Sequence, residues 1–223
     1  MLYRLIYFGN SMTFSDKIII FLSFTFAVIL SLTVHEFSHA YVSHKLGDDT
    51  AKINGRMTLN PMAHFDIVGL LSFLILGFGW AKPVPVNAYN FKNIKRDTLL
   101  VSLAGIFTNF IFFFVFYPLS LIMFKILQSN QHIIIYILYN LFFFIYEANL
   151  VLMVFNLLPV YPLDGFNALA SQLKYNNRYV LFMQRYGVFI LITLALVFSY
   201  TNVFDYLVDF VGYPVRLFWG LFF

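Results

Sequence analysis

Two histidines separated by three residues stand at the end of an apolar stretch, in the sequence His35-Glu36-Phe37-Ser38-His39. Residues four apart share one face of a helix, so both imidazoles could bind a single metal ion. Glu36 directly follows the first histidine, where its carboxylate could take a proton from a water that the metal activates. These residue types at this spacing predict zinc-dependent hydrolysis.

Coincidence is a poor explanation of this motif. The chain has 223 residues, with five histidines and two glutamates. Random placement of these residues gives about 0.001 such motifs in a chain of this composition. Ionisable side chains are also costly in a membrane helix, so a cluster of three indicates a function.

A catalytic zinc usually has three protein ligands and one open coordination position, so a third ligand must come from elsewhere in the chain. Asp164 follows a helix end that Pro159 and Pro162 interrupt. Broken helices at membrane depth are tolerated mainly where they line a protein cavity, which makes this carboxylate a good ligand. Glu147 instead suits a polar network, and His44 suits the membrane interface. The residues alone leave five candidates open: Glu147, Asp164, His44, His64 and His132.

The composition indicates that lipid surrounds much of this chain. Hydrophobic residues make up 61% of the sequence and charged residues 11%, whereas soluble domains average about 45–50% and about 25%. A chain of this size could not bury so much apolar surface in one core, which excludes an ordinary cytosolic enzyme. The lack of cysteine excludes disulfides and cysteine metal sites, and no basic run indicates nucleic-acid binding.

Four stretches are long enough to cross a bilayer, which takes about 20 apolar residues. They are residues 18–34 with a helical continuation to 45, 99–124, 133–158 and 186–204. Residues 67–81 are also apolar, but this stretch is short for a span and contains three glycines. Residues 206–223 mix charged with aromatic residues and suit an interfacial helix or a poor final span.

Beyond the metal motif, the sequence resembles the site-2 proteases, a family of intramembrane zinc metalloproteases. The resemblance covers residues from about 31 to 166 and is strongest to the short branch without PDZ or CBS domains. It is carried by HEFSH at 35–39, GRMTLNP at 55–61, HFD at 64–66, GWAKPVPVN at 79–87, AGxxxN at 104–109 and NxxPxxxxDG at 156–165. The sequence departs from the family pattern at Ile106 and Tyr161, where proline is common.

The resemblance implies roles for individual residues. His35, His39 and Asp164 would hold one zinc ion, and Glu36 would activate the attacking water. Asn156 would position the substrate or the oxyanion, although a buried amide bonded to helix carbonyls explains this residue equally well. Asn109 is better explained as a helix-packing residue than as a catalytic group.

The predicted fold is an all-α polytopic membrane protein, with residues 1–223 forming a single intramembrane metalloprotease domain. A catalytic core of three helices, at about 17–45, 98–125 and 133–158, would be followed by C-terminal helices. A re-entrant or β-hairpin segment would occupy about 64–90. Within it, the proline-rich stretch 82–91 is typical of an edge strand or a loop.

The order of the spans predicts how residues 67–81 behave. His35 and His39 lie in the second half of the first span, near the side of the membrane where it ends. Asp164 reaches that side only if 67–81 enters the membrane and returns. Ten Lys and Arg residues then lie on that side and three on the other, with Arg216 unassigned. The positive-inside rule makes the richer side cytoplasmic.

The leading hypothesis is a zinc-dependent intramembrane endopeptidase that cleaves in or near transmembrane segments of protein or peptide substrates, as in regulated intramembrane proteolysis. We expect a multi-pass protein of a bacterial cell membrane, with its active site toward the cytoplasm and no nucleic-acid partner. Two alternatives remain, a zinc or other divalent-metal transporter and a catalytically silent membrane scaffold. A glutamate between two ligands favours hydrolysis over both.

Overall fold

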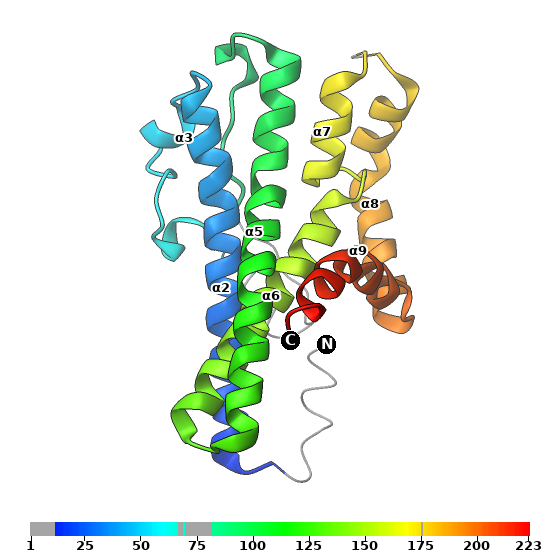
Figure 1. Cartoon of the computed structure of the whole chain (residues 1–223). Coiled ribbons are helices and arrows are strands. Elements are labelled where there is room, and N and C mark those ends of the chain that lie inside the picture. Colours follow the sequence, from blue (N-terminus) through cyan, green and yellow to red (C-terminus); the bar gives the residue numbers. More distant parts are fainter. Residues whose placement is uncertain (1–11, 67–68, 70–81, 175) are drawn as a thin grey trace.

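The described residues of this computed structural model, 12–66, 69, 82–174 and 176–223, form helices and loops without a strand (Figure 1). This confirms the predicted all-α class. The elements are α2 (Phe14–Lys45), α3 (Thr50–Ile53), η2 (Pro61–Ala63), η3 (Ala88–Asn90), α5 (Ile94–Ser129), α6 (Ile133–Leu157), α7 (Asp164–Gln172), α8 (Arg178–Tyr200) and α9 (Val203–Gly220).

The long helices begin at side chains that satisfy their first free amide groups. Thr13 and Asp16 form a capping box at α2, in which the Thr13 N–H donates to the Asp16 carboxylate at 3.0 Å. Asn93 and Asn177 cap α5 and α8 through their side-chain oxygens. These caps let the helices start in polar sequence, outside the uncharged stretches that predicted them.

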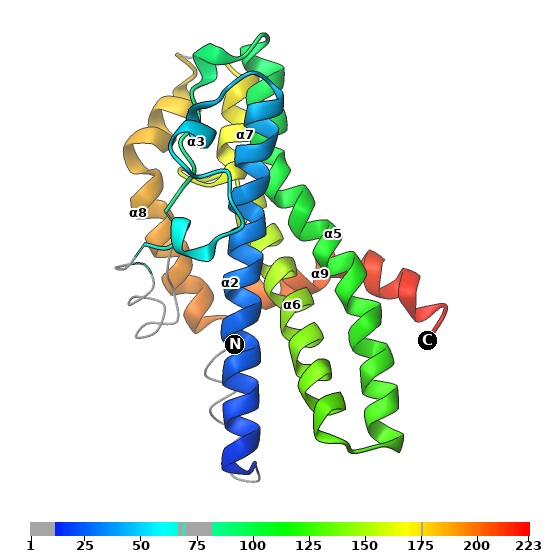
Figure 2. The same cartoon turned by 90° about the vertical axis from the view of Figure 1, so that its left-hand side faces the viewer.

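Four of the described helices are long and apolar enough to cross a membrane: α2, α5, α6 and α8. Each overlaps one of the four predicted stretches, although α6 ends at Leu157 and α8 at Tyr200, before the predicted ends at 158 and 204. Only 11% of the most apolar window of α8 is buried, so most of this helix faces away from the protein. α9 is not among the four and lies across the long helices (Figure 2), as the interfacial alternative for the C-terminal stretch predicts.

The centre of the fold is a bundle of α2, α5 and α6, which run alongside one another in both views (Figures 1 and 2). α7 packs against α5 near the end of the bundle where α2 finishes. Apolar side chains of α5, α6 and α9 form the main core: Ile106, Phe113, Tyr146, Leu150, Met153, Val154, Val208 and Val215. The bundle therefore fixes α7 relative to the second half of α2.

Within the predicted 64–90 segment, residues 64–66 and 82–87 are loop and residues 88–90 form the short 3₁₀ helix η3, while η2 directly precedes the segment. Of the two alternatives for 82–91, the structure has the loop. The predicted re-entrant stretch 67–81 lies, except for one residue, outside the described residues. Its flanks meet, because the Lys82 N–H donates to the His64 carbonyl at 2.8 Å.

Candidate metal centre

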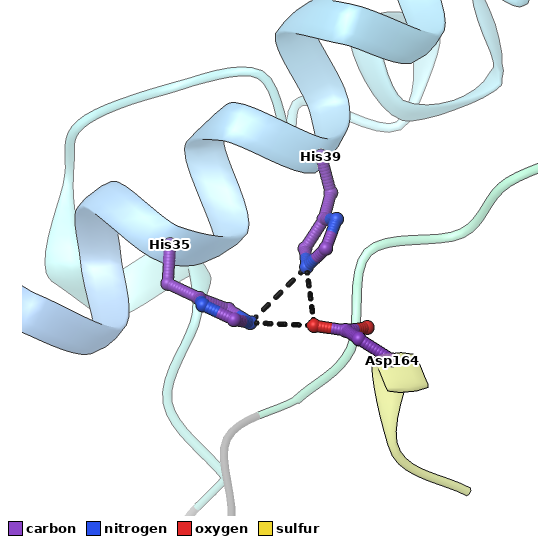
Figure 3. Close-up of side chains that lie close together, drawn as sticks. All are labelled: His35, His39 and Asp164. Atoms are coloured by element: carbon purple, nitrogen blue, oxygen red, sulfur yellow. Dashed lines mark hydrogen bonds and ion pairs between the residues drawn. The ribbon is translucent and has the colours of Figure 1, made fainter. Parts of the chain in front are cut away.

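His35 and His39 lie one turn apart on α2, both buried, and α7 begins at Asp164 directly beside them (Figure 3). His35 Nε2, His39 Nε2 and Asp164 Oδ2 are each 3.1 Å from the other two. A tetrahedral zinc ion with bonds of about 2.0–2.1 Å places its ligand atoms roughly 3.3 Å apart. The three atoms therefore have the spacing of three corners of a zinc site.

The hydrogen bonding of His39 shows why a cation suits this position. Its Nδ1 lies 2.7 Å from the Val101 carbonyl oxygen, which can only accept, so Nδ1 carries the hydrogen. When the ring is neutral, Nε2 directs its lone pair toward the Asp164 carboxylate, which also only accepts. Two such groups 3.1 Å apart are held together by a cation between them, which is a metal ion at an occupied site and a proton on Nε2 without one. This donor set fits zinc.

The surroundings of Asp164 keep its carboxyl group ionised. Burial raises the pKa of Asp164, but the charges and hydrogen bonds of His39 and His35 outweigh burial and lower the pKa below its ordinary value. The ionised carboxylate is the form that binds metal.

Two glycines permit the close approach of the helices at this centre. A Cβ atom at Gly105 of α5 would lie only 2.5 Å from Cε1 of His35. A Cβ atom at Gly165 would lie 2.4 Å from the Leu157 carbonyl oxygen at the end of α6. Gly105 thus leaves room for the imidazoles, and Gly165 allows the tight turn that brings Asp164 back to them.

Glu36 faces the loop that follows residue 81. Its Oε2 accepts a hydrogen bond from the Val84 N–H at 3.0 Å. Val84 stands between Pro83 and Pro85, which have no N–H, so it supplies the single backbone donor of these three residues. This contact was not predicted, although a lone donor between two prolines is a signal that the sequence contains.

Asp48 anchors the same loop to the end of α2. Its buried carboxylate accepts hydrogen bonds from Thr50, from the Asn87 N–H at 2.8 Å and from the Asn90 side chain at 2.7 Å. Burial raises the pKa of Asp48, but these hydrogen bonds outweigh burial and lower it to about 2. A buried charge therefore holds the loop that carries Val84.

The two asparagines considered from the sequence have different surroundings. Asn109 is 0% exposed, and its amide lies 3.2 Å from Nδ1 of His35, so it contacts a candidate ligand as well as packing between helices. The Asn156 amide donates to the Leu152 carbonyl at 3.0 Å, the bond of an amide within a helix. A catalytic role for Asn156 stays a prediction.

The remaining candidates for the third ligand have other positions. His44 pairs with an aspartate, His64 is hydrogen-bonded to a backbone carbonyl, and His132 caps the start of α6. Glu147 lies 4.0 Å from Arg216 of α9 in an ion pair, which gives this acid the polar partner that the sequence did not identify. Of the five candidates, the structure brings the aspartate of α7 to the two histidines.

Known proteins share much of this sequence. The chain is 45% identical over 139 residues to a Bacillus subtilis protein named "Putative zinc metalloprotease YwhC", a match that covers 62% of this chain and 64% of that protein. It is 26% identical over 215 residues to a Mycolicibacterium smegmatis protein named "Putative zinc metalloprotease Rip2", with 87% and 80% covered. A Mycobacterium tuberculosis protein with that name is 27% identical over 150 residues, with 66% and 55% covered.

The chain is thus similar to zinc metalloproteases of the kind to which its sequence was compared, the site-2 proteases. The predicted resemblance is thus confirmed, and the names of these relatives support a zinc metalloprotease. This chain spans less than two thirds of the length of the Bacillus subtilis and Mycobacterium tuberculosis proteins. No family model matches the sequence, and no solved structure matches it.

Proposed function

We propose that this chain is a zinc-dependent intramembrane endopeptidase that hydrolyses peptide bonds in or near the transmembrane segments of membrane proteins. The observation that carries the proposal is the spacing of His35, His39 and Asp164, whose ligand atoms are 3.1 Å apart, with Glu36 next to the first ligand. The names of the relatives support the metal and the reaction class, and the four apolar helices support a substrate that reaches the site within lipid.

In this proposal, His35, His39 and Asp164 hold the ion. When bound there, zinc would polarise the scissile carbonyl and make water acidic enough to ionise near neutral pH. Glu36 takes the proton of the attacking water and passes it to the leaving amine. The Val84 N–H, bonded to one carboxylate oxygen at 3.0 Å, fixes the orientation of this base.

Asn156 is the proposed partner of the developing oxyanion. A side-chain amide nitrogen carries two hydrogens, and the bond to the Leu152 carbonyl uses one of them. The second hydrogen would donate to the substrate. This role predicts a loss of turnover in Asn156→Leu.

We also propose that the site opens toward the cytoplasm. The described parts of the segments between α2 and α5 and between α6 and α8 lie on the side of the bundle where α2 ends and α7 packs (Figure 1). These regions and the adjoining helix ends carry ten of the fourteen Lys and Arg residues: Lys45, Lys52, Arg56, Lys82, Lys92, Lys95, Arg96, Lys174, Arg178 and Arg185. The positive-inside rule supports a cytoplasmic location for this end.

The function is tested with the Glu36→Gln variant in vesicles that also contain a membrane-anchored substrate. We expect cleavage to fall by about 100-fold or more while bound zinc is unchanged, because the variant loses the base and keeps all three ligands. Glu147→Gln alters the chain's other glutamate, which pairs with α9, and should retain cleavage. Undiminished cleavage by Glu36→Gln would remove Glu36 as the base, and zinc flux into the vesicles would favour a transporter.

A further inference from the structure

We propose that Asn109 is a positioning residue for the metal centre. Its side-chain oxygen accepts the Nδ1 hydrogen of His35 and so holds the Nε2 lone pair of that ring toward His39 and Asp164. This inference rests on the proposed function, since it assigns Asn109 a task only if the three residues bind a metal ion.

The contact between Asn109 and His35 is built into the packing of α5 against α2. Asn109 is 0% exposed, and its amide lies 3.2 Å from His35 Nδ1. Gly105, one turn earlier on α5, lies against the same imidazole. Residues four apart share a helix face, so one face of α5 both makes room for the ring and bonds to it.

Proton placement decides what this contact does. A histidine that binds metal through Nε2 carries its hydrogen on Nδ1, and that hydrogen needs an acceptor. His39 has the Val101 carbonyl oxygen, at 2.7 Å. The Asn109 amide, at 3.2 Å, is the group placed to serve His35 in the same way.

The amide of Asn109 has an oxygen to offer. In the structure its nitrogen faces His35 Nδ1, and its buried Oδ1 has no hydrogen-bond partner among the described residues. A half-turn of the amide exchanges the two atoms at almost no cost in shape. In either orientation, the amide atom that faces away from His35 has no partner in the described part of the chain, so that atom does not decide between the two. The Nδ1 hydrogen of the metal-binding ring does decide, because it needs an acceptor and so selects the orientation with oxygen facing His35.

A second asparagine shows what a packing role alone looks like. Asn149 of α6 is also 0% exposed, and its Oδ1 is likewise buried without a partner in the described structure. Its amide nitrogen donates to Ser31 Oγ at 2.7 Å and to the Ile145 carbonyl at 2.8 Å, and neither group is a candidate ligand. Asn149 is therefore a matched control for burial and polarity.

The experiment compares zinc affinity of the full chain in detergent micelles, by chelator competition, for wild type, Asn109→Leu, Asn109→Asp and Asn149→Leu. We expect Asn109→Leu to weaken zinc binding by about 10–100-fold, the usual effect of removing the partner of a ligating histidine. Asn109→Asp, which offers only acceptors, should bind zinc within a few-fold of wild type, as should Asn149→Leu. Cobalt substitution gives a second readout, since Asn109→Leu should alter the visible absorption of the bound Co²⁺.

Several results would overturn the inference. Asn109→Leu could bind zinc as tightly as wild type, or Asn109→Asp could lose as much affinity as Asn109→Leu. An equal loss in Asn109→Leu and Asn149→Leu would point to general destabilisation and also contradict it. A wild-type chain that binds no zinc would instead refute the proposed function, so the two failures are distinguishable.

Discussion

At the scale of single residues, a helix can present two histidines to an ion but cannot surround it, because ligands one turn apart lie on one side. The candidate third ligand is Asp164, which the broken helix end after α6 returns to the histidines of α2. Residue types and spacing alone left Asp164 among five candidates, because the choice depends on the path of the whole chain, and the family resemblance was what singled it out. The contacts of Val101 and Asn109 with the rings were also beyond the sequence, since a backbone carbonyl can come from any residue.

The close packing at Gly105 gives a prediction at this scale. In Gly105→Ala the new Cβ would lie 2.5 Å from His35 Cε1, so either the ring or α5 must move. We expect zinc affinity, measured by chelator competition, to fall by at least about tenfold. Gly220→Ala, at a glycine with no atom within 4 Å of its added Cβ, should bind zinc like wild type. Unchanged affinity in Gly105→Ala would contradict the observed contact of α5 with the imidazole.

At the scale of elements, the apolar stretches predicted the long helices because hydrophobic length is a local property of the sequence. The ends of these helices were less predictable. Helix α5, for example, begins at Ile94 within charged sequence, because Asn93 caps it there. The loop 82–91 could not be told from an edge strand, since both tolerate prolines. Its conformation depends on the buried Asp48, which is distant in sequence.

The charge of Asp48 makes the stability of this region pH-dependent. Its pKa is lowered to about 2 in the folded chain, from an unfolded value of about 3.9. The stabilisation is therefore fully present above about pH 4 and is lost as the pH falls toward 2, with a total on the order of 2 kcal/mol.

Thermal unfolding in micelles checks this for wild type and Asp48→Asn. The unfolding temperature of Asp48→Asn should be well below that of wild type at pH 7, and this difference, the gap, should narrow between pH 4 and pH 2. Asp205→Asn changes an exposed aspartate at the start of α9 and should show a smaller gap than Asp48→Asn at pH 7. A gap for Asp48→Asn that stays constant down to pH 2 would contradict the assignment.

At the scale of the whole molecule, the metal site requires three helices to arrive on the correct side of the membrane. The parity of the spans predicted that 67–81 begins and ends on one side, and its flanks, Lys82 and His64, are hydrogen-bonded at 2.8 Å. The prediction for 67–81 itself lies outside the described residues. The sequence could predict on which side of the membrane each helix ends, because successive spans alternate in direction. It could not predict how far along the bundle each side chain lies, because that position depends on the packing of α2, α5 and α6.

The orientation of the molecule can be measured directly, because the chain has no cysteine of its own. Single variants Lys52→Cys, at the metal-site end, and Gln131→Cys, in the turn between α5 and α6, place one thiol at each end of the bundle. A membrane-impermeant thiol reagent added to intact cells should label Gln131→Cys but not Lys52→Cys. Labelling of Lys52→Cys under these conditions would overturn the cytoplasmic assignment of the site.

The central claim is that His35, His39 and Asp164 together bind zinc, and the most direct test is the zinc content of the purified full chain. After dialysis against a weak chelator, wild type should retain one zinc ion per chain, as should His132→Ala, which alters a histidine at the far end of α6. His39→Ala and Asp164→Asn should each retain almost none. Zinc bound at the wild-type level in both of these variants would contradict the account.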